Sequence, residues 1–111
     1  MLKDLTKQYV DAFNSKNIDK IVTLFADNFA LEDPVVKRIE GKKEVLVAIQ
    51  GIFNSCERLS FEAKNIYQDN QTTIIEFTLK LDETILTGTD IIEWNDNGTM
   101  SELRAYLDIP K

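Results

Sequence analysis

Two carboxylic acids and one phenol are the residues of this sequence whose positions could support chemistry. Asp33 and Asp90 each occur at the apolar parity of a strand-like pattern, so both side chains are expected to face the interior. Tyr9 lies on the apolar stripe of a helical pattern near the start of the chain. Three separate segments therefore each bring one ionisable group to a hydrophobic interior.

Burial separates the roles that two such acids can play. Because an ionised carboxylate is costly to bury, a buried acid either finds partners or stays protonated, and a protonated acid donates a hydrogen bond at neutral pH. An acid that keeps some contact with water can stay ionised and act as a base. With a tyrosine as a second donor, this set has the parts needed to move a proton next to a carbonyl group.

Each of the three residues also has a purely structural explanation. An aspartate before a proline, as in Asp33-Pro34, is common in turns. The parity of Asp90 would reverse at a bulge or a register slip, and Gly88 is a position where a bulge is expected. Tyr9 taken alone is better explained by core packing.

The composition excludes several classes of function. The chain has 111 residues, 19 of them acidic and 13 basic, a net charge of −6, and no histidine. The negative charge argues against a nucleic-acid or anionic-membrane partner. Without histidine there is no Ser-His-Asp or Cys-His catalysis and no histidine-based metal site. No glycine-rich phosphate loop is present either, and we expect neither a metal nor a cofactor.

The sequence shows no sign of export or membrane insertion. Its single cysteine, Cys56, cannot form an internal disulfide, and no apolar run reaches the roughly 18 residues that span a membrane. We expect a cytoplasmic protein. The length and the apolar fraction of 43% predict one domain over residues 1–111.

Helical periodicity fills the first half of the chain. A first helix is predicted up to the break at residues 14–17, and Asn17 is the predicted N-cap of a second helix that ends at Asp27-Asn28. A short strand over residues 29–33 and an extended return over 35–40 follow. Gly41 opens a third helix, which ends near Asn54.

The apolar period then changes to two. Strands are predicted over residues 59–67, 72–81, 85–94 and 100–109, with turns at Asp69-Asn70 and Asp96-Asn97-Gly98. Helices followed by an antiparallel meander are typical of α+β domains, in which the helices cover one face of the sheet. Arg104 has the parity of the outer face.

Several stretches of the sequence together form a recognisable pattern. They are Gln8-Tyr9-Val10-Asp11-Ala12-Phe13-Asn14, residues 18–27, Leu31-Glu32-Asp33-Pro34-Val35, Gly41, residues 89–95, Gly98 and residues 101–105. Through these stretches the sequence resembles bacterial ketosteroid isomerase over nearly its whole length. The similarity is closest in residues 8–35. The larger group is the nuclear transport factor 2-like superfamily, which includes the SnoaL-like proteins.

The resemblance implies a cone-shaped, cystatin-like α+β fold, in which a curved antiparallel sheet packs on three N-terminal helices and encloses a pocket. A small hydrophobic molecule is the expected occupant. The expected lining, at inward positions, consists of Phe29, Leu31, Phe53, Phe77, Leu86, Gly88, Ile92, Leu103 and Leu107. The resemblance also implies a homodimer through the sheets, in agreement with an apolar patch on the outer parity. That patch consists of Ile74, Ile85, Ile91, Met100 and Tyr106.

The resemblance assigns a separate role to each ionisable residue. Tyr9 and a protonated Asp90 would hold the oxygen of a dienolate, and Asp33 would move a proton from the carbon beside an enone carbonyl to a carbon further along. Ketosteroid isomerase is itself the known example of an aspartic acid kept neutral by its apolar site. Ile49 stands where the family can carry a tyrosine that supports the oxyanion tyrosine.

Two functions are compatible with these residues. The first is an isomerase that moves a double bond in a hydrophobic enone or ketone, which the complete set of Tyr9, Asp33 and Asp90 favours. The second is a SnoaL-like protein of different chemistry, or of none, that binds a small apolar ligand. A shared fold does not decide between them.

Overall fold

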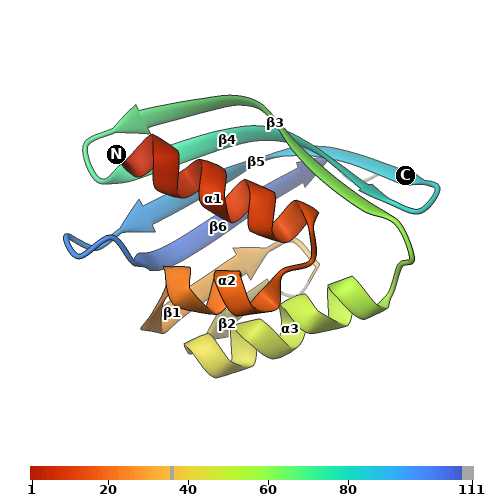
Figure 1. Ribbon diagram of the computed structural model, residues 1–111, viewed down its shortest axis with the longest axis horizontal. Helices are drawn as coiled ribbons and strands as arrows, with labels where there is room; N and C mark the ends of the chain where they lie inside the picture. The colour runs from red at the N-terminus through yellow and green to blue at the C-terminus, as the bar shows by residue number, and fades with distance from the viewer. Residues whose placement is uncertain (36, 109–111) are drawn as a thin grey trace.

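The computed structural model of the chain describes residues 1–35 and 37–108. This part of the chain forms three helices, α1 (Leu2–Asn14), α2 (Ile18–Leu24) and α3 (Lys42–Asn54). Its strands are β1 (Phe25–Asp33), β2 (Lys37–Glu40), β3 (Leu59–Asp69), β4 (Thr72–Leu81), β5 (Thr84–Trp94) and β6 (Met100–Asp108). Figure 1 shows α1 lying across the long strands β3 and β4, with α2 and α3 near β1.

The strands form one sheet in the order β2-β1-β6-β5-β4-β3. The α+β class is confirmed, with helices packed on the sheet. The sheet is mixed and not purely antiparallel, because β1 and β6 run parallel. Parallel neighbours need a long crossover connection, and here all the elements from β2 to β5 separate the two strands in sequence. The other neighbouring strands pair antiparallel.

Both predicted helix starts are confirmed. The Asn17 side chain accepts a hydrogen bond from the backbone N–H of Lys20 at 3.2 Å, as an N-cap does. Gly41 precedes α3 with a φ of +100°, a conformation that favours glycine. The predicted end of the second helix at Asp27-Asn28 is wrong. The helix ends at Leu24, because the extended backbone of Phe25 already belongs to β1.

The predicted meander is confirmed in β3 to β6. Asn70, with a φ of 55°, joins β3 to β4, and Gly98, with a φ of 84°, lies in the turn from β5 to β6. The predicted extended return over residues 35–40 contains β2, but residue 36 lies outside the described residues. Ile109, the predicted end of the last strand, also lies outside them.

The predicted outward orientation of one residue, Met100, is wrong. Met100 is 0% exposed and lies in the core. The register shifts beside it, because Glu93 pairs with Glu102 whereas Trp94 pairs with Met100, so one extra residue sits in β6. Such a bulge reverses the face of the residues beyond it.

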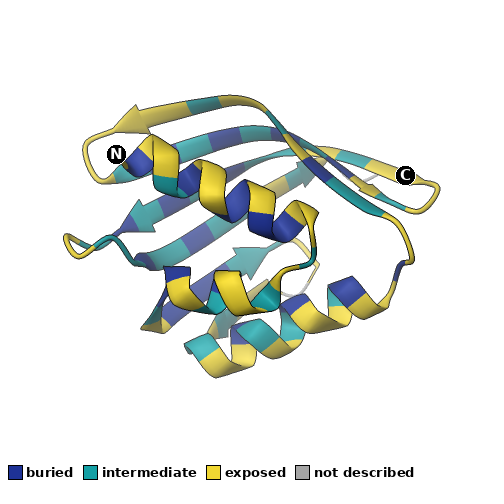
Figure 2. Ribbon diagram, viewed as in Figure 1, coloured by how far each residue is buried: buried dark blue, intermediate teal, exposed yellow. Residues whose placement is uncertain are grey.

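The other apolar residues of the outer face lie as expected. Ile74 and Ile91 are half-buried, and Ile85 and Tyr106 are 57% and 54% exposed. Figure 2 shows how burial concentrates where the helices and the sheet face each other. No helix in residues 1–35 and 37–108 is long and apolar enough to cross a membrane.

Candidate active site

A cavity of about 90 Å³ lies between the helices and the inner face of the sheet, and the three ionisable residues all line it. α1 supplies Tyr9, the last residue of β1 supplies Asp33, and β5 supplies Asp90. The remaining wall is apolar. It includes the predicted residues Phe29, Leu31, Phe77, Leu103 and Leu107.

Four residues of the predicted lining lie elsewhere. Phe53 packs edge-on against Phe13, with ring centroids 5.0 Å apart. Gly88 is covered by Phe77, since a Cβ atom on Gly88 would lie 2.9 Å from the Cζ atom of that ring. Leu86 is half-buried outside the cavity wall, and Ile92 is fully buried in the core. Inward parity therefore does not by itself place a residue on the cavity wall.

Sequence reasoning did not assign several wall residues to the cavity. They are Phe13, Phe25, Ile49, Ile52, Phe61, Leu79 and Ala105. Phe13 follows Tyr9 by one helical turn, a spacing that would have placed it beside Tyr9. The rings of Phe25 and Phe29 stack with centroids 4.0 Å apart and 13° between planes. The apolar pattern of the sequence does not separate residues of the cavity wall from residues of the core, because both face inward.

Asp90 is the most unusual residue of the cavity. It is 4% exposed, and its Oδ1 atom has no hydrogen-bond partner in the described part of the chain. Burial first, and then the negative charge of Asp33, raises the pKa of Asp90 to about 8. At neutral pH Asp90 is therefore mainly the neutral acid, which can donate a hydrogen bond into the cavity.

Tyr9 is a second donor at the same cavity. It is 4% exposed, and its ring is surrounded by those of Phe13, Phe25 and Phe61, with centroids 6.0, 6.4 and 6.3 Å away. Burial, and then the charge of Asp90, raises the pKa of Tyr9 well above its ordinary value. The phenol therefore keeps its proton at neutral pH.

Asp33 is both a turn residue and a residue of the cavity wall. Its Oδ1 atom accepts a hydrogen bond from the backbone N–H of Val35 at 2.7 Å, which is the turn role. The residue is half-buried and also lines the cavity. The turn therefore holds this carboxylate where the cavity meets the surface.

The cavity adjoins a groove at this point. Asp33, Ala105 and Leu107 line both the cavity and a groove of about 440 Å³, whose wall also includes Tyr106. The pairing of β1 with β6 ends at Glu32 and Arg104, while β6 continues to Asp108. Beyond Arg104, β6 therefore continues without a β1 partner, beside Asp33.

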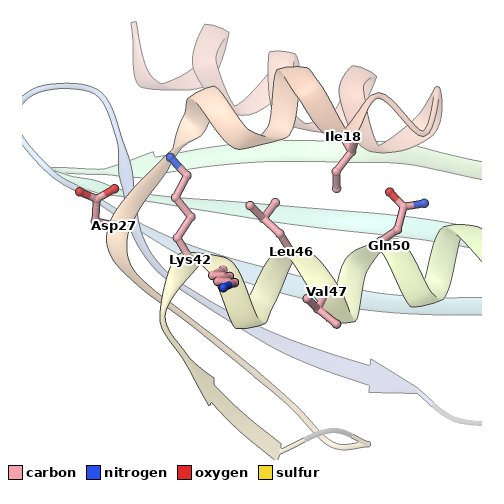
Figure 3. Close-up of a pocket in the computed structure, with 7 residues that line it drawn as sticks. Ile18, Asp27, Lys42, Leu46, Val47 and Gln50 are labelled. Atoms are coloured by element: carbon pink, nitrogen blue, oxygen red, sulfur yellow. The ribbon is translucent and has the colours of Figure 1, made fainter.

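A second depression, between α2 and α3, has a different character (Figure 3). Ile18 of α2 points toward α3 there, and Val47 is exposed. Its charged residues, including Asp27 and Lys42, are not buried. Without a desolvated ionisable group, this depression offers little basis for catalysis.

The donor set of the cavity does not resemble a metal centre. In the described residues, no group of three or more Cys, Asp or Glu side chains is placed to hold a metal ion. The arrangement at the cavity, two neutral donors and one half-buried carboxylate, suits the transfer of a proton and the stabilisation of an oxyanion.

Known proteins share this fold. A candidate ketosteroid isomerase from Kribbella flavida has a TM-score of 0.87 at 20% identity, over 99% of this chain and 79% of that one. A candidate isomerase of the SnoaL-like family from Agrobacterium tumefaciens has a TM-score of 0.79 at 18% identity, over 96% of both chains. A candidate SnoaL-like polyketide cyclase from Shewanella denitrificans has a TM-score of 0.84 at 11% identity, over 96% and 90%.

These identities support the fold and not the activity. No curated protein matches the sequence. The model of the SnoaL-like domain, however, matches residues 6–103, which is most of the chain. The protein therefore belongs to the SnoaL-like domain family.

Proposed function

We propose that this protein is an isomerase that moves a double bond in an unsaturated ketone through a dienolate. The unpaired Oδ1 atom of Asp90 carries the proposal. A buried polar atom without a partner is costly, and a ligand that hydrogen-bonds to this carboxyl group would relieve that cost. Tyr9 lines the same cavity, so one ligand oxygen could accept from both donors.

The proposed reaction has two proton transfers. Asp33 takes a proton from the carbon between the carbonyl group and the double bond, and the electron pair of that C–H bond moves toward the carbonyl oxygen. The resulting dienolate oxygen accepts hydrogen bonds from Tyr9 and the neutral Asp90. Asp33 then returns the proton to the far carbon of the double bond, which leaves a conjugated ketone. Donors aimed at the developing charge are the main source of acceleration in such a step.

The size of the cavity bears on the substrate. Sites for drug-sized ligands enclose about 300–1,000 Å³. This cavity, with about 90 Å³, is smaller than such sites. We therefore infer that the reacting ketone end occupies the cavity and that any larger remainder lies along the groove beside Tyr106. Small unsaturated ketones are better first substrates than steroids.

An absorbance assay tests the proposal. The wild-type protein is mixed with a small β,γ-unsaturated cyclic ketone, or with a β,γ-unsaturated 3-ketosteroid, and conjugation is followed in the ultraviolet. Asp33→Asn should lower the rate by about 10²-fold or more, since the base is removed. Asp69→Asn is the matched control, because Asp69 is exposed at the end of β3 and lines neither the cavity nor the groove. No turnover of any ketone by the wild-type protein would contradict the proposal.

A binding protein without this chemistry is the second candidate. The apolar wall and the small volume of the cavity favour it, since they suit an apolar ligand whether or not it reacts. Calorimetry with small aromatic ligands separates the two. Tight binding that is unchanged in Asp33→Asn, together with no turnover, would favour the binding protein.

A further inference from the structure

We propose that Thr6 and Asn14 are positioning residues, which hold α1 at two points so that the Tyr9 hydroxyl meets the same ligand oxygen as Asp90. The inference rests on the proposed function, because it concerns the placement of the two donors. It begins with the hydrogen bonds that join α1 to the sheet.

The first connection is fully buried. Thr6 is 0% exposed, and its hydroxyl is hydrogen-bonded to Thr73 Oγ1 of β4 at 2.8 Å and to the carbonyl oxygen of Leu2 at 2.7 Å. The indole N–H of Trp94 on β5 donates to Thr73 Oγ1 at 2.9 Å. One continuous chain of hydrogen bonds therefore links α1, β4 and β5.

This chain of hydrogen bonds reaches β5, the strand that carries Asp90, and its neighbour β4. Thr73 pairs with Ile92, and Ile75, the next residue of β4 on the same face, pairs with Asp90. The connection through Thr6 therefore ties α1 to β4 and β5 one inward-facing pair away from the carboxyl group. Any shift of the helix along the sheet at this point would change the separation of Tyr9 and Asp90.

The second connection lies at the other end of the helix. The Oδ1 atom of Asn14 accepts a hydrogen bond from the backbone N–H of Phe61 on β3 at 2.8 Å. The Phe61 ring meets the Tyr9 ring edge-on, with centroids 6.3 Å apart and 82° between planes. The same residue that anchors the end of α1 therefore also limits where the tyrosine ring can lie.

Tyr9 lies between the two connections. It follows Thr6 by three residues and precedes Asn14 by five, which is about 4.5 Å and 7.5 Å along the helix axis. One connection would let the helix pivot about it, whereas two fix its direction. The rings of Phe13, Phe25 and Phe61 also pack around Tyr9. Hydrogen bonds depend more steeply on distance and angle than ring contacts do, so the two connections supply the main geometric restraint on the helix.

A phenol that mimics the dienolate oxygen tests this inference. Phenols of graded acidity are added to the wild-type protein at pH 7, and their affinity and ionised fraction when bound are read from the absorbance spectrum. Thr6→Val removes the hydroxyl and keeps the shape, and we expect affinity to fall on the order of tenfold, with a smaller ionised fraction. Thr6→Ser should restore both.

The matched control is Thr23→Val on α2. The Thr23 hydroxyl also bonds to a carbonyl oxygen of its own helix, that of Lys20 at 2.6 Å, but it is exposed and is not part of the cavity wall. The Thr23→Val variant should therefore bind phenols as the wild type does. Melting temperatures are measured for all variants. A purely structural role for Thr6 would lower the melting temperature of Thr6→Val and leave the spectrum of the bound phenol as in the wild type, which would overturn the inference.

Asn14→Ala provides the second test and decides the matter if Thr6→Val does not fold. It should also weaken phenol binding and reduce the ionised fraction, and wild-type values would overturn the inference. If the wild-type protein itself binds no phenol, the proposed function fails and the inference fails with it. Normal binding by the wild type and by both variants would overturn the positioning roles alone.

Discussion

Tyr9 and Asp90 approach one cavity from opposite layers of the molecule, Tyr9 from α1 and Asp90 from β5. Burial, and then the charge of an ionised Asp90, would hold the pKa of Tyr9 well above its ordinary value. Both groups hold their protons at neutral pH, and the nearby Asp33 raises the pKa of Asp90. The cavity thus combines two donors with one carboxylate at its edge.

The stability of the folded protein should depend on pH through Asp90. Its pKa rises from an ordinary 3.8 to about 8 on folding. Between these values the folded state holds a proton that the unfolded state has released, so the stabilisation is complete below about pH 4 and is lost as the pH rises to 8. This one group contributes a fall of about 1.4 kcal/mol per pH unit in that window.

Asp90→Asn removes this contribution. Urea denaturation at pH 5, 6, 7 and 8 should show a flatter dependence of the free energy of unfolding on pH than in the wild type. Asp69→Asn, at an exposed residue at the end of β3, is the matched control and should keep the wild-type slope. Equal slopes for wild type and Asp90→Asn would mean that Asp90 is ionised in the folded state.

Removing the phenol hydroxyl should slow the reaction and preserve the fold. Tyr9→Phe deletes one of the two donors, and the loss of one oxyanion donor costs about 10²–10³ in kcat. The rate of ketone conjugation measures this effect. Tyr67→Phe is the control, because the Tyr67 hydroxyl bonds to Glu76 at 2.8 Å and the residue is exposed. Equal losses in the two variants would contradict a specific role for Tyr9.

The features of the fold that depend on residues close together in the sequence could be predicted, whereas those that join distant segments could not. The turns at Asn70 and Gly98 depend on local backbone conformation, and the sequence predicted both. The parallel pairing of β1 with β6 joins distant segments and leaves no local pattern. Phe25 misled the prediction of the second helix, because its spacing from Ile21 fits a helical stripe although its backbone is extended.

The candidate site shows the same division. Asp33 and Asp90 were placed inward correctly because the facing of strand residues alternates locally, and no bulge separates Asp90 from its neighbours in β4. The bulge in β6 did misplace Met100, since one inserted residue reverses the parity. Phe13 lines the cavity and Phe53 does not. This difference depends on how the helices pack together, and the spacing of apolar residues in the sequence does not reveal that packing.

Gly88 should not tolerate a side chain. A Cβ atom there would lie 2.5 Å from the backbone oxygen of Tyr106 and 2.9 Å from the Phe77 ring. Gly88→Ala should therefore lower the free energy of unfolding by about 1–3 kcal/mol. Gly51→Ala is the control, since nothing lies within 4 Å of its Cβ position in α3, and it should stabilise the protein by about 0.5–1 kcal/mol. Urea denaturation at pH 7 measures both. A Gly88→Ala variant with an unchanged free energy of unfolding would show that β6 moves away readily.

We also propose that two copies of the chain associate through the outer face of the sheet. Ile74 and Ile91 pair across β4 and β5, and the exposed rings of Tyr67 and Tyr106 lie on the neighbouring strands. An apolar patch of this kind favours association. Ile91→Asp or Tyr106→Asp should convert a dimer to a monomer in sedimentation at micromolar concentration. A monomeric wild-type protein under these conditions would contradict the proposal.

The exchange of ketone protons with solvent tests the central claim most directly. A small ketone is incubated with the protein in D₂O, and deuterium uptake at the carbon beside the carbonyl group is followed by proton NMR. Wild-type protein should accelerate the uptake, and Asp33→Asn should slow it by about 10²-fold, because that carboxylate removes the proton. Uptake no faster than in buffer, or equal rates for the wild type and Asp33→Asn, would contradict an enolising active site in this cavity.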